Sequence, residues 1–110
     1  MKLLLASGSK TRAEILDKAK IPYEVVKHNV DEEEAKISYA HLTSEDIATK
    51  LAELKAIKPS YQYENSFVIG ADQVLELNDT IINKAKDINE AKGQLLKLQG
   101  KNHKLITSIA

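Results

Sequence analysis

A short apolar run near the start of the chain, Leu3-Leu4-Leu5-Ala6, constrains the fold more than any other feature. Apolar and polar residues do not alternate in it, which is typical of a strand buried on both faces. The run stops at Ser7-Gly8-Ser9-Lys10, and a stripe of apolar residues then predicts a helix over Thr11–Lys20. Ile21-Pro22 ends that helix, because proline lacks the N–H donor and biases the residue before it toward extended geometry.

The rest of the chain continues to alternate between strand and helix patterns. The predicted strands are Tyr23–Lys27, Phe67–Ile69, Val74–Leu77, Thr80–Ile82 and Lys104–Ile109, and the predicted helices run from Thr43 or Ser44 to Lys58 and from Asp87 to Leu98. Thr43 with Asp46, and Asp87 with Glu90, have the spacing of helix N-terminal capping pairs. Asn78-Asp79 predicts a tight hairpin turn. The order β-α-β-α-β-β-β-α-β predicts an α/β fold with a mixed β-sheet flanked by helices.

Length and composition exclude several classes of protein. The 110 residues suit a single domain, 1–110. There is no cysteine, which excludes disulfides and zinc ribbons. The 16 basic residues balance 16 acidic ones, which argues against binding to nucleic acids or anionic membranes. No apolar stretch approaches the ~20 residues that span a bilayer, and no signal-peptide pattern is present. We expect a cytoplasmic protein with no nucleic-acid or membrane partner.

The turn from Ser7 to Arg12 is the first candidate site. Small residues between a strand and a helix expose backbone N–H groups at the helix N-terminus, and those donors together with the helix dipole favour phosphate. Ser7, Ser9 and Thr11 add hydroxyl groups, and Arg12, the only arginine among the 16 basic residues, adds a fork of donors. The spacing alone nevertheless favours a simpler interpretation, a capping serine followed by a solvated first turn.

Carboxylates form the second candidate site. Asp72 follows the apolar strand Phe67–Ile69 directly, and ligands of open α/β sheets bind beyond the carboxyl ends of strands. Such a carboxylate can hold a divalent metal or orient a water molecule, although it can equally cap a turn. The run Asp31–Glu34 reads as a solvated acidic face, from which one or two residues could join Asp72 around Mg²⁺ or Mn²⁺.

Basic residues outside the first turn give weaker signals. Lys55 lies between Leu54 and Ala56 in a predicted helix, and Lys84 follows an apolar pair, so each alone reads as a surface lysine. The three histidines, His28, His41 and His103, have no metal-ligand spacing, and we interpret them as surface or loop residues.

Taken together, these stretches resemble the Maf family, the septum-formation-inhibitor-like nucleoside triphosphate pyrophosphatases. The matching segments, in order, are LLASGSKTRAEIL (4–16), IPYEVVKHNVDEE (21–33), LAELKA (51–56), VIGADQVL (68–75) and KAKDINEAKGQLLKLQGKNHKLITSIA (84–110). Each segment is modest alone, but five in the right order over nearly the whole chain are specific. The resemblance implies a Maf/ITPase-like fold of which this chain covers about the first half.

The resemblance also implies a reaction and a set of site residues. Family members hydrolyse a nucleoside triphosphate between the α- and β-phosphates, releasing the monophosphate and pyrophosphate, and require a divalent cation such as Mg²⁺ or Mn²⁺. The positions that match the family's motifs are Asp72 and Glu32 for catalysis and metal binding, and Ser7, Ser9, Arg12, Lys55 and Lys84 for contact with the substrate phosphates. A carboxylate pair such as Asp72 and Glu32 would repel unless a cation lay between them, so the residues themselves also favour a metal.

Three departures from the family pattern carry expectations of their own. Lys10 and Thr11 stand where members usually have proline and a first arginine, which removes one bidentate phosphate contact. Gln73 follows Asp72, as in members of the 7-methyl-GTP type rather than the dTTP/UTP type. Finally, the family's second half, which helps form the nucleotide pocket, has no match here.

The missing half leaves a second interpretation open. The chain is an active pyrophosphatase or its N-terminal half, or it is a catalytically inactive remnant that folds and binds phosphate. Strand edges left unpaired by the missing half favour a homodimer.

Overall fold

The computed structural model describes residues 1–110 and contains the predicted elements together with one additional helix. The elements are β1 (Lys2–Leu5), α1 (Lys10–Lys18), β2 (Glu24–Val25), α2 (Glu32–Ser38), α3 (Ser44–Ser60), β3 (Ser66–Ile69), β4 (Ala71–Leu77), β5 (Thr80–Ile82), α4 (Ile88–Leu98) and β6 (Lys104–Ile109). The α/β fold class predicted from the sequence is therefore confirmed, and most predicted bounds hold within two residues. The largest exception is β4, which begins at Ala71 instead of Val74. The strand β2 is shorter than predicted, with two of its five predicted residues paired.

The strands form two three-stranded sheets instead of the single mixed sheet that we expected. In the first sheet, β1 lies between β2 and β3 and is parallel to both, in the order β2-β1-β3. In the second sheet, β4 lies between β5 and β6 and is antiparallel to both. The helices α1, α2 and α3 lie in the connections of the parallel sheet, because parallel neighbours require long crossover connections.

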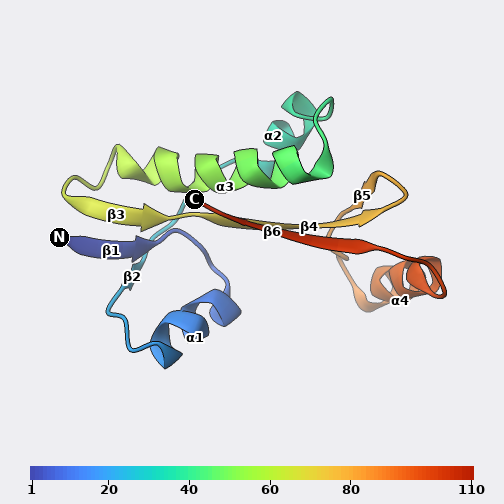
Figure 1. Cartoon of the computed structure of the whole chain (residues 1–110), viewed down its shortest axis with the longest axis horizontal. Helices are drawn as coiled ribbons and strands as arrows, with labels where there is room; N and C mark the ends of the chain where they lie inside the picture. Colours follow the sequence, from blue (N-terminus) through green and yellow to red (C-terminus); the bar gives the residue numbers. More distant parts are fainter.

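Gly70 joins the two sheets. It separates β3 from β4, so that one nearly continuous extended segment passes from the parallel sheet into the antiparallel one (Figure 1). Its N–H donates to the carbonyl of Ala110 over 2.9 Å, and its carbonyl accepts from the N–H of Ala110 over 2.8 Å. The pairing of β4 with β6 thus extends to the junction between the sheets.

The helix α3 covers this junction and supplies much of the core. It packs against β3, β4 and β6 along the upper side in Figure 1. A Cβ built on Gly70 would lie 2.4 Å from the carbonyl oxygen of Ala52 and 2.5 Å from the backbone N of Ala56, so only glycine permits this close approach. Leu51 and Ala52 of the same helix are fully buried.

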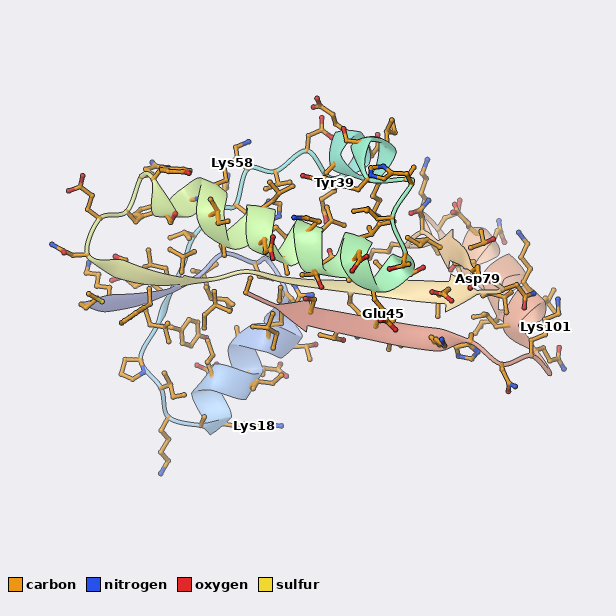
Figure 2. The ribbon with its side chains drawn as sticks, turned by 45° about the horizontal axis from the view of Figure 1, so that its top comes forward. Lys18, Tyr39, Glu45, Lys58, Asp79 and Lys101 are labelled. Atoms are coloured by element: carbon orange, nitrogen blue, oxygen red, sulfur yellow. The ribbon has the colours of Figure 1, made fainter.

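The helix α2 was not predicted, because the acidic run was interpreted as a solvated face. Asp31 caps it, accepting a hydrogen bond from the N–H of Glu34 over 3.1 Å, and Glu32, Glu33 and Glu34 form its first turn. Carboxylates in the first turn of a helix are stabilised by the positive end of its dipole. Ala35 then packs against Ile47 and Leu51 of α3, and Figure 2 shows Tyr39 where α2 meets α3.

Local signals elsewhere were interpreted correctly. The N–H of Asp46 donates to the Thr43 hydroxyl over 3.2 Å, and the N–H of Glu90 donates to Asp87 over 2.8 Å, so both predicted caps are confirmed. Asn78 and Asp79 have positive φ values of 51° and 62°, as the predicted tight hairpin turn requires. Gly100, with φ of 68°, follows the end of α4.

The other two long helices are less well packed. No residue of α1 or α4 is buried, and in Figure 1 both lie below the strands, on the side opposite to α3. No helix has the length and apolar character needed to cross a bilayer.

Candidate active site

The loop between β1 and α1 forms one wall of the candidate site. Its conformation follows from local hydrogen bonds. The Ser9 hydroxyl caps α1 by accepting from the N–H of Arg12 over 3.3 Å, and the Ser7 hydroxyl accepts from the N–H of Ser9 over 3.2 Å. The Arg12 guanidinium folds back and donates to the same Ser7 hydroxyl over 2.9 Å. Ser9 is therefore the capping serine of the simpler interpretation, and Lys10 and Thr11 of the first turn are exposed, whereas Ser7 is buried at 6% exposed. Phosphate binding by this turn stays a prediction.

The close contact between α3 and the β3–β4 segment sets the position of Lys55 and Asp72. Lys55 lies on α3 beside the residues that touch Gly70, and Asp72 lies two residues after Gly70 in β4. Asp72 is therefore part of a strand and does not cap a turn. Both side chains are buried, with residue exposures of 6% for Lys55 and 5% for Asp72.

The Lys55 ammonium bridges two carboxylates. Its Nζ lies 2.8 Å from Oδ1 of Asp72 and 2.6 Å from Oε1 of Glu32, which is in the first turn of α2. The additional helix α2 is what carries Glu32 to this position. The ammonium thus offsets part of the repulsion between the two carboxylates, and the divalent cation expected beside them stays a prediction.

The second carboxylate oxygen of Asp72 has no partner. Its Oδ2 is buried and makes no hydrogen bond. Such atoms are rare in folded proteins, because a buried polar atom without a partner is costly. Asp72 therefore keeps one strong acceptor free.

A pocket of about 890 Å³ lies over this cluster. Its lining includes the seven residues that match the motifs of the family: Ser7, Ser9, Arg12, Glu32, Lys55, Asp72 and Lys84. Thr11, whose hydroxyl was also a candidate for phosphate contact, is exposed and does not line the pocket. The remaining polar lining residues are Gly8, Lys10, His28, Lys36, Gln73, Asn83 and Gln94. The structure thus brings together phosphate-binding chemistry from the first turn and carboxylates from α2 and β4, although the individual roles of these residues stay predictions.

The ionisation of Glu32 follows from its neighbours. Its partial burial alone would raise the pKa of the carboxyl group, but the hydrogen bond and charge of Lys55, with smaller contributions from His28 and Lys36, lower the pKa below the ordinary value. Glu32 is therefore held as a carboxylate, the form that can neutralise Lys55 or bind a cation.

His28 and Lys36 are pocket residues that the sequence analysis did not select. Burial, followed by the charge of Lys55, lowers the pKa of His28, and its Nδ1 accepts from the N–H of Val30 over 2.9 Å. The His28 ring is in a loop, as expected, but it faces the pocket. Lys36 lies one turn after Glu32 in α2 and donates to the Asn83 side chain over 3.3 Å. Recognising α2 in the sequence would have put Lys36 on the same helix as Glu32.

Comparison with known proteins identifies the family of the chain. The sequence model of a family described as "Maf-like protein" matches residues 2–110, which is nearly the whole chain. The chain belongs to the Maf family. The resemblance noted from the five sequence segments is therefore confirmed.

The Maf relatives that the chain matches carry related names. It is 38% identical over 109 residues to "Nucleoside triphosphate pyrophosphatase" of Maricaulis maris, covering 99% of this chain and 56% of that protein. It is 40% identical over 111 residues to "7-methyl-GTP pyrophosphatase" of Brucella abortus, covering 99% of this chain and 56% of that protein. It is 39% identical over 109 residues to "dTTP/UTP pyrophosphatase" of Bacillus cytotoxicus, covering 99% of this chain and 55% of that protein. The chain spans about half the length of the curated relatives it matches.

Proposed function

We propose that this Maf-family chain takes part in the hydrolysis of nucleoside triphosphates to the monophosphate and pyrophosphate. The observation that carries the proposal is the free, buried Oδ2 of Asp72 in a pocket that Arg12 and Lys84 also line. A free carboxylate oxygen beside several cationic side chains is what water attack on a bound polyphosphate requires. The names of the relatives support the same class of reaction.

Binding of the triphosphate would rest on the first turn and the lysines. The N-terminus of α1 offers backbone N–H donors and the positive end of the helix dipole, and Arg12 offers a guanidinium beside them. Lys10 and Lys84 add point charges from two other positions on the rim. Together these groups would neutralise the charge that moves onto the leaving pyrophosphate as the bond breaks.

The hydrolytic step would use Asp72. Oδ2 accepts a proton from a water molecule, the water oxygen bonds to the α-phosphorus, and the bond from that phosphorus to the bridging oxygen breaks. The bridging oxygen and its electron pair leave with pyrophosphate, and one water is consumed for each triphosphate. Lys55, itself paired with Glu32, would hold the Asp72 carboxylate in position during this step.

A divalent cation fits the same residues. Asp72 and Glu32 would hold it, since both carboxylates contact one ammonium and Asp72 retains a free oxygen. Mg²⁺ and Mn²⁺ prefer such hard oxygen ligands. The cation would supply additional neutralisation of the phosphate charge.

Pyrophosphate release tests the proposal. The purified chain is incubated with dTTP, UTP, CTP or 7-methyl-GTP and Mg²⁺ or Mn²⁺, beside the isosteric variant Asp72→Asn. We expect turnover that the variant lowers by about 100-fold or more, the usual contribution of a positioned general base. Equal release from the two proteins would overturn the assignment of Asp72.

A second candidate is phosphate binding without turnover, for which the lining of the pocket by Lys10, Arg12 and Lys84 would be enough. A thermal shift with pyrophosphate and Mg²⁺ separates the two. Stabilisation without product release supports a binding module, whereas release of pyrophosphate from any of the four nucleotides excludes it.

A further inference from the structure

Lys55 cannot easily leave the two carboxylates that it bridges. Its residue is 6% exposed, and its backbone carbonyl carbon lies 2.9 Å from where a Cβ on Gly70 would be. The close packing of α3 on the strand thus fixes the base of the side chain. Its ammonium makes short contacts with Asp72 and Glu32 at 2.8 Å and 2.6 Å. A positive charge is built into the place where a divalent cation would bind.

The protein also offers such a cation few ligands. One oxygen of each carboxylate contacts Lys55, which leaves Oδ2 of Asp72 and the second oxygen of Glu32. No cluster of three or more His, Cys, Asp and Glu side chains suited to a metal occurs in the chain. His28, which also lines the pocket, uses its Nδ1 to accept from Val30. Octahedral Mg²⁺ or Mn²⁺ would need most of its ligands from elsewhere.

Triphosphate oxygens are the obvious source of those ligands. Mg²⁺ in nucleotide enzymes is commonly held by one or two carboxylates together with substrate phosphates, not by a protein cage. The cluster of two carboxylates and one ammonium carries a net charge of only −1, which attracts a divalent cation less than the carboxylates alone would.

We propose that Lys55 keeps the Glu32–Asp72 pair from retaining a divalent cation by itself, so that the cation binds together with the polyphosphate. The inference rests on the proposed function, because it assumes that the pocket takes a triphosphate. In addition to its predicted contact with the substrate, Lys55 would then act as a positioning residue that sets the affinity of the pair for the metal.

Mn²⁺ binding measured by electron paramagnetic resonance tests this inference, with Mn²⁺ alone as the probe. For the unmodified chain we expect no saturable binding at concentrations up to about 1 mM. In Lys55→Met the bridging charge is lost, and we expect Mn²⁺ to bind about tenfold or more tightly. Lys55→Arg keeps the charge and should leave Mn²⁺ affinity within about threefold of the original.

Lys50→Met is the matched control. Lys50 is on the same helix, and its half-exposed side chain forms an ion pair with Glu53 at 3.8 Å. The substitution Lys50→Met removes the same charge from the chain as Lys55→Met does, but at a site where water and salt screen it. The affinity for Mn²⁺ should therefore change by less than about threefold. If Lys50→Met strengthened Mn²⁺ binding as much as Lys55→Met, total charge would explain the effect and the inference would be wrong.

Folding provides a second readout, because Lys55→Met brings two carboxylates together without a counter-charge. We expect Mn²⁺ to raise the melting temperature of that variant by several degrees while leaving that of the unmodified chain unchanged. If neither melting temperature responds to Mn²⁺, or if the unmodified chain binds Mn²⁺ tightly by itself, the inference fails. Neither result depends on pyrophosphate release, which tests the proposed function separately.

The ternary complex completes the test. The probe is a non-hydrolysable triphosphate analogue in which methylene bridges the α- and β-phosphorus atoms. A mixture of the unmodified chain and this analogue should bind more Mn²⁺ than the analogue binds alone. Absence of that excess would contradict joint binding of cation and polyphosphate.

Discussion

Lys55 is a lysine within the apolar stripe of α3, and its ammonium ends between two carboxylates. As a pattern in the sequence it reads as a surface residue, and only the resemblance to the Maf family singled it out. Its neighbours are 17 positions away at Asp72 and 23 positions away at Glu32, so no local signal connects them. Asp72 was noticeable because it follows an apolar strand, whereas Glu32 was one of four adjacent acidic residues.

His28 and Glu32 make the stability of the chain depend on pH. The pKa of His28 is lowered from 6.5 and that of Glu32 from 4.5 in the folded chain. In both cases the unfolded chain binds protons more readily, so the stabilisation is complete above the unfolded pKa and is lost as the pH falls through the folded one. We expect the free energy of unfolding in urea to fall first below about pH 6.5, through His28, and again below about pH 4.5, through Glu32.

The variant His28→Asn separates these two contributions. An asparagine oxygen can replace Nδ1 as the acceptor for Val30, but it does not titrate. The variant should lose the decline between about pH 7.5 and pH 5.5 and keep the one at lower pH. A decline in the first interval that is the same in both proteins would show that His28 does not cause it.

Among the elements, the contact between α3 and the β3–β4 segment organises the site. The glycine between the strands lets the helix backbone touch the strand, and this contact aligns Lys55 with Asp72. The caps of α3 and α4 could be read from the sequence, because a cap involves residues three apart. The equally local cap of α2 was missed, because the acidic run was interpreted as a solvated face. The requirement for Gly70 could not be read from the sequence, because the atoms that a Cβ would strike belong to a helix 14 to 18 residues away.

Gly70→Ala tests this contact. The added methyl group would meet backbone atoms of Ala52 and Ala56 at 2.4 and 2.5 Å, so α3 must move away from the strand. We expect a loss of about 1–3 kcal/mol in the free energy of unfolding, the usual cost of overpacking, together with weaker pyrophosphate release.

Gly93→Ala is the control for that measurement. Gly93 lies within α4, and nothing is within 4 Å of a Cβ placed there. Alanine should stabilise the helix by up to about 1 kcal/mol. Equal effects of the two substitutions on stability would contradict the packing argument.

The whole molecule exposes more surface than its size predicts. Its accessible surface is 8016 Å², against about 6,100 Å² for a compact monomer of 12.2 kDa. Its radius of gyration is 15.4 Å, against about 13 Å. The large apolar side chains that remain exposed include Ile15, Phe67, Leu95, Leu96, Leu105 and Ile109. An extended α/β body with this much apolar surface is prone to associate.

We therefore expect the isolated chain to self-associate, in line with the homodimer anticipated from its sequence. Size-exclusion chromatography with light scattering should give a mass that is a multiple of 12.2 kDa, and the dye ANS should fluoresce on binding. Replacing Leu95 and Leu96, which are 68% and 71% exposed on α4, with lysine should lower both signals. A monomer that does not bind ANS would show that the exposed apolar residues do not drive association.

The sequence by itself determined the order of the elements other than α2, the caps at Thr43 and Asp87, the hairpin turn at Asn78-Asp79 and the family. The local features depend on residues that are close together in the chain, and the family on sequence segments that follow one another in a fixed order. The tertiary structure alone decided that the strands divide into two sheets at Gly70, that α2 carries Glu32 and Lys36 to the pocket, and that Lys55 bridges two carboxylates. The physical reason is distance along the chain: a helix cap or tight turn is stabilised by neighbours, whereas the charged cluster exists only after α3 has packed against the strand.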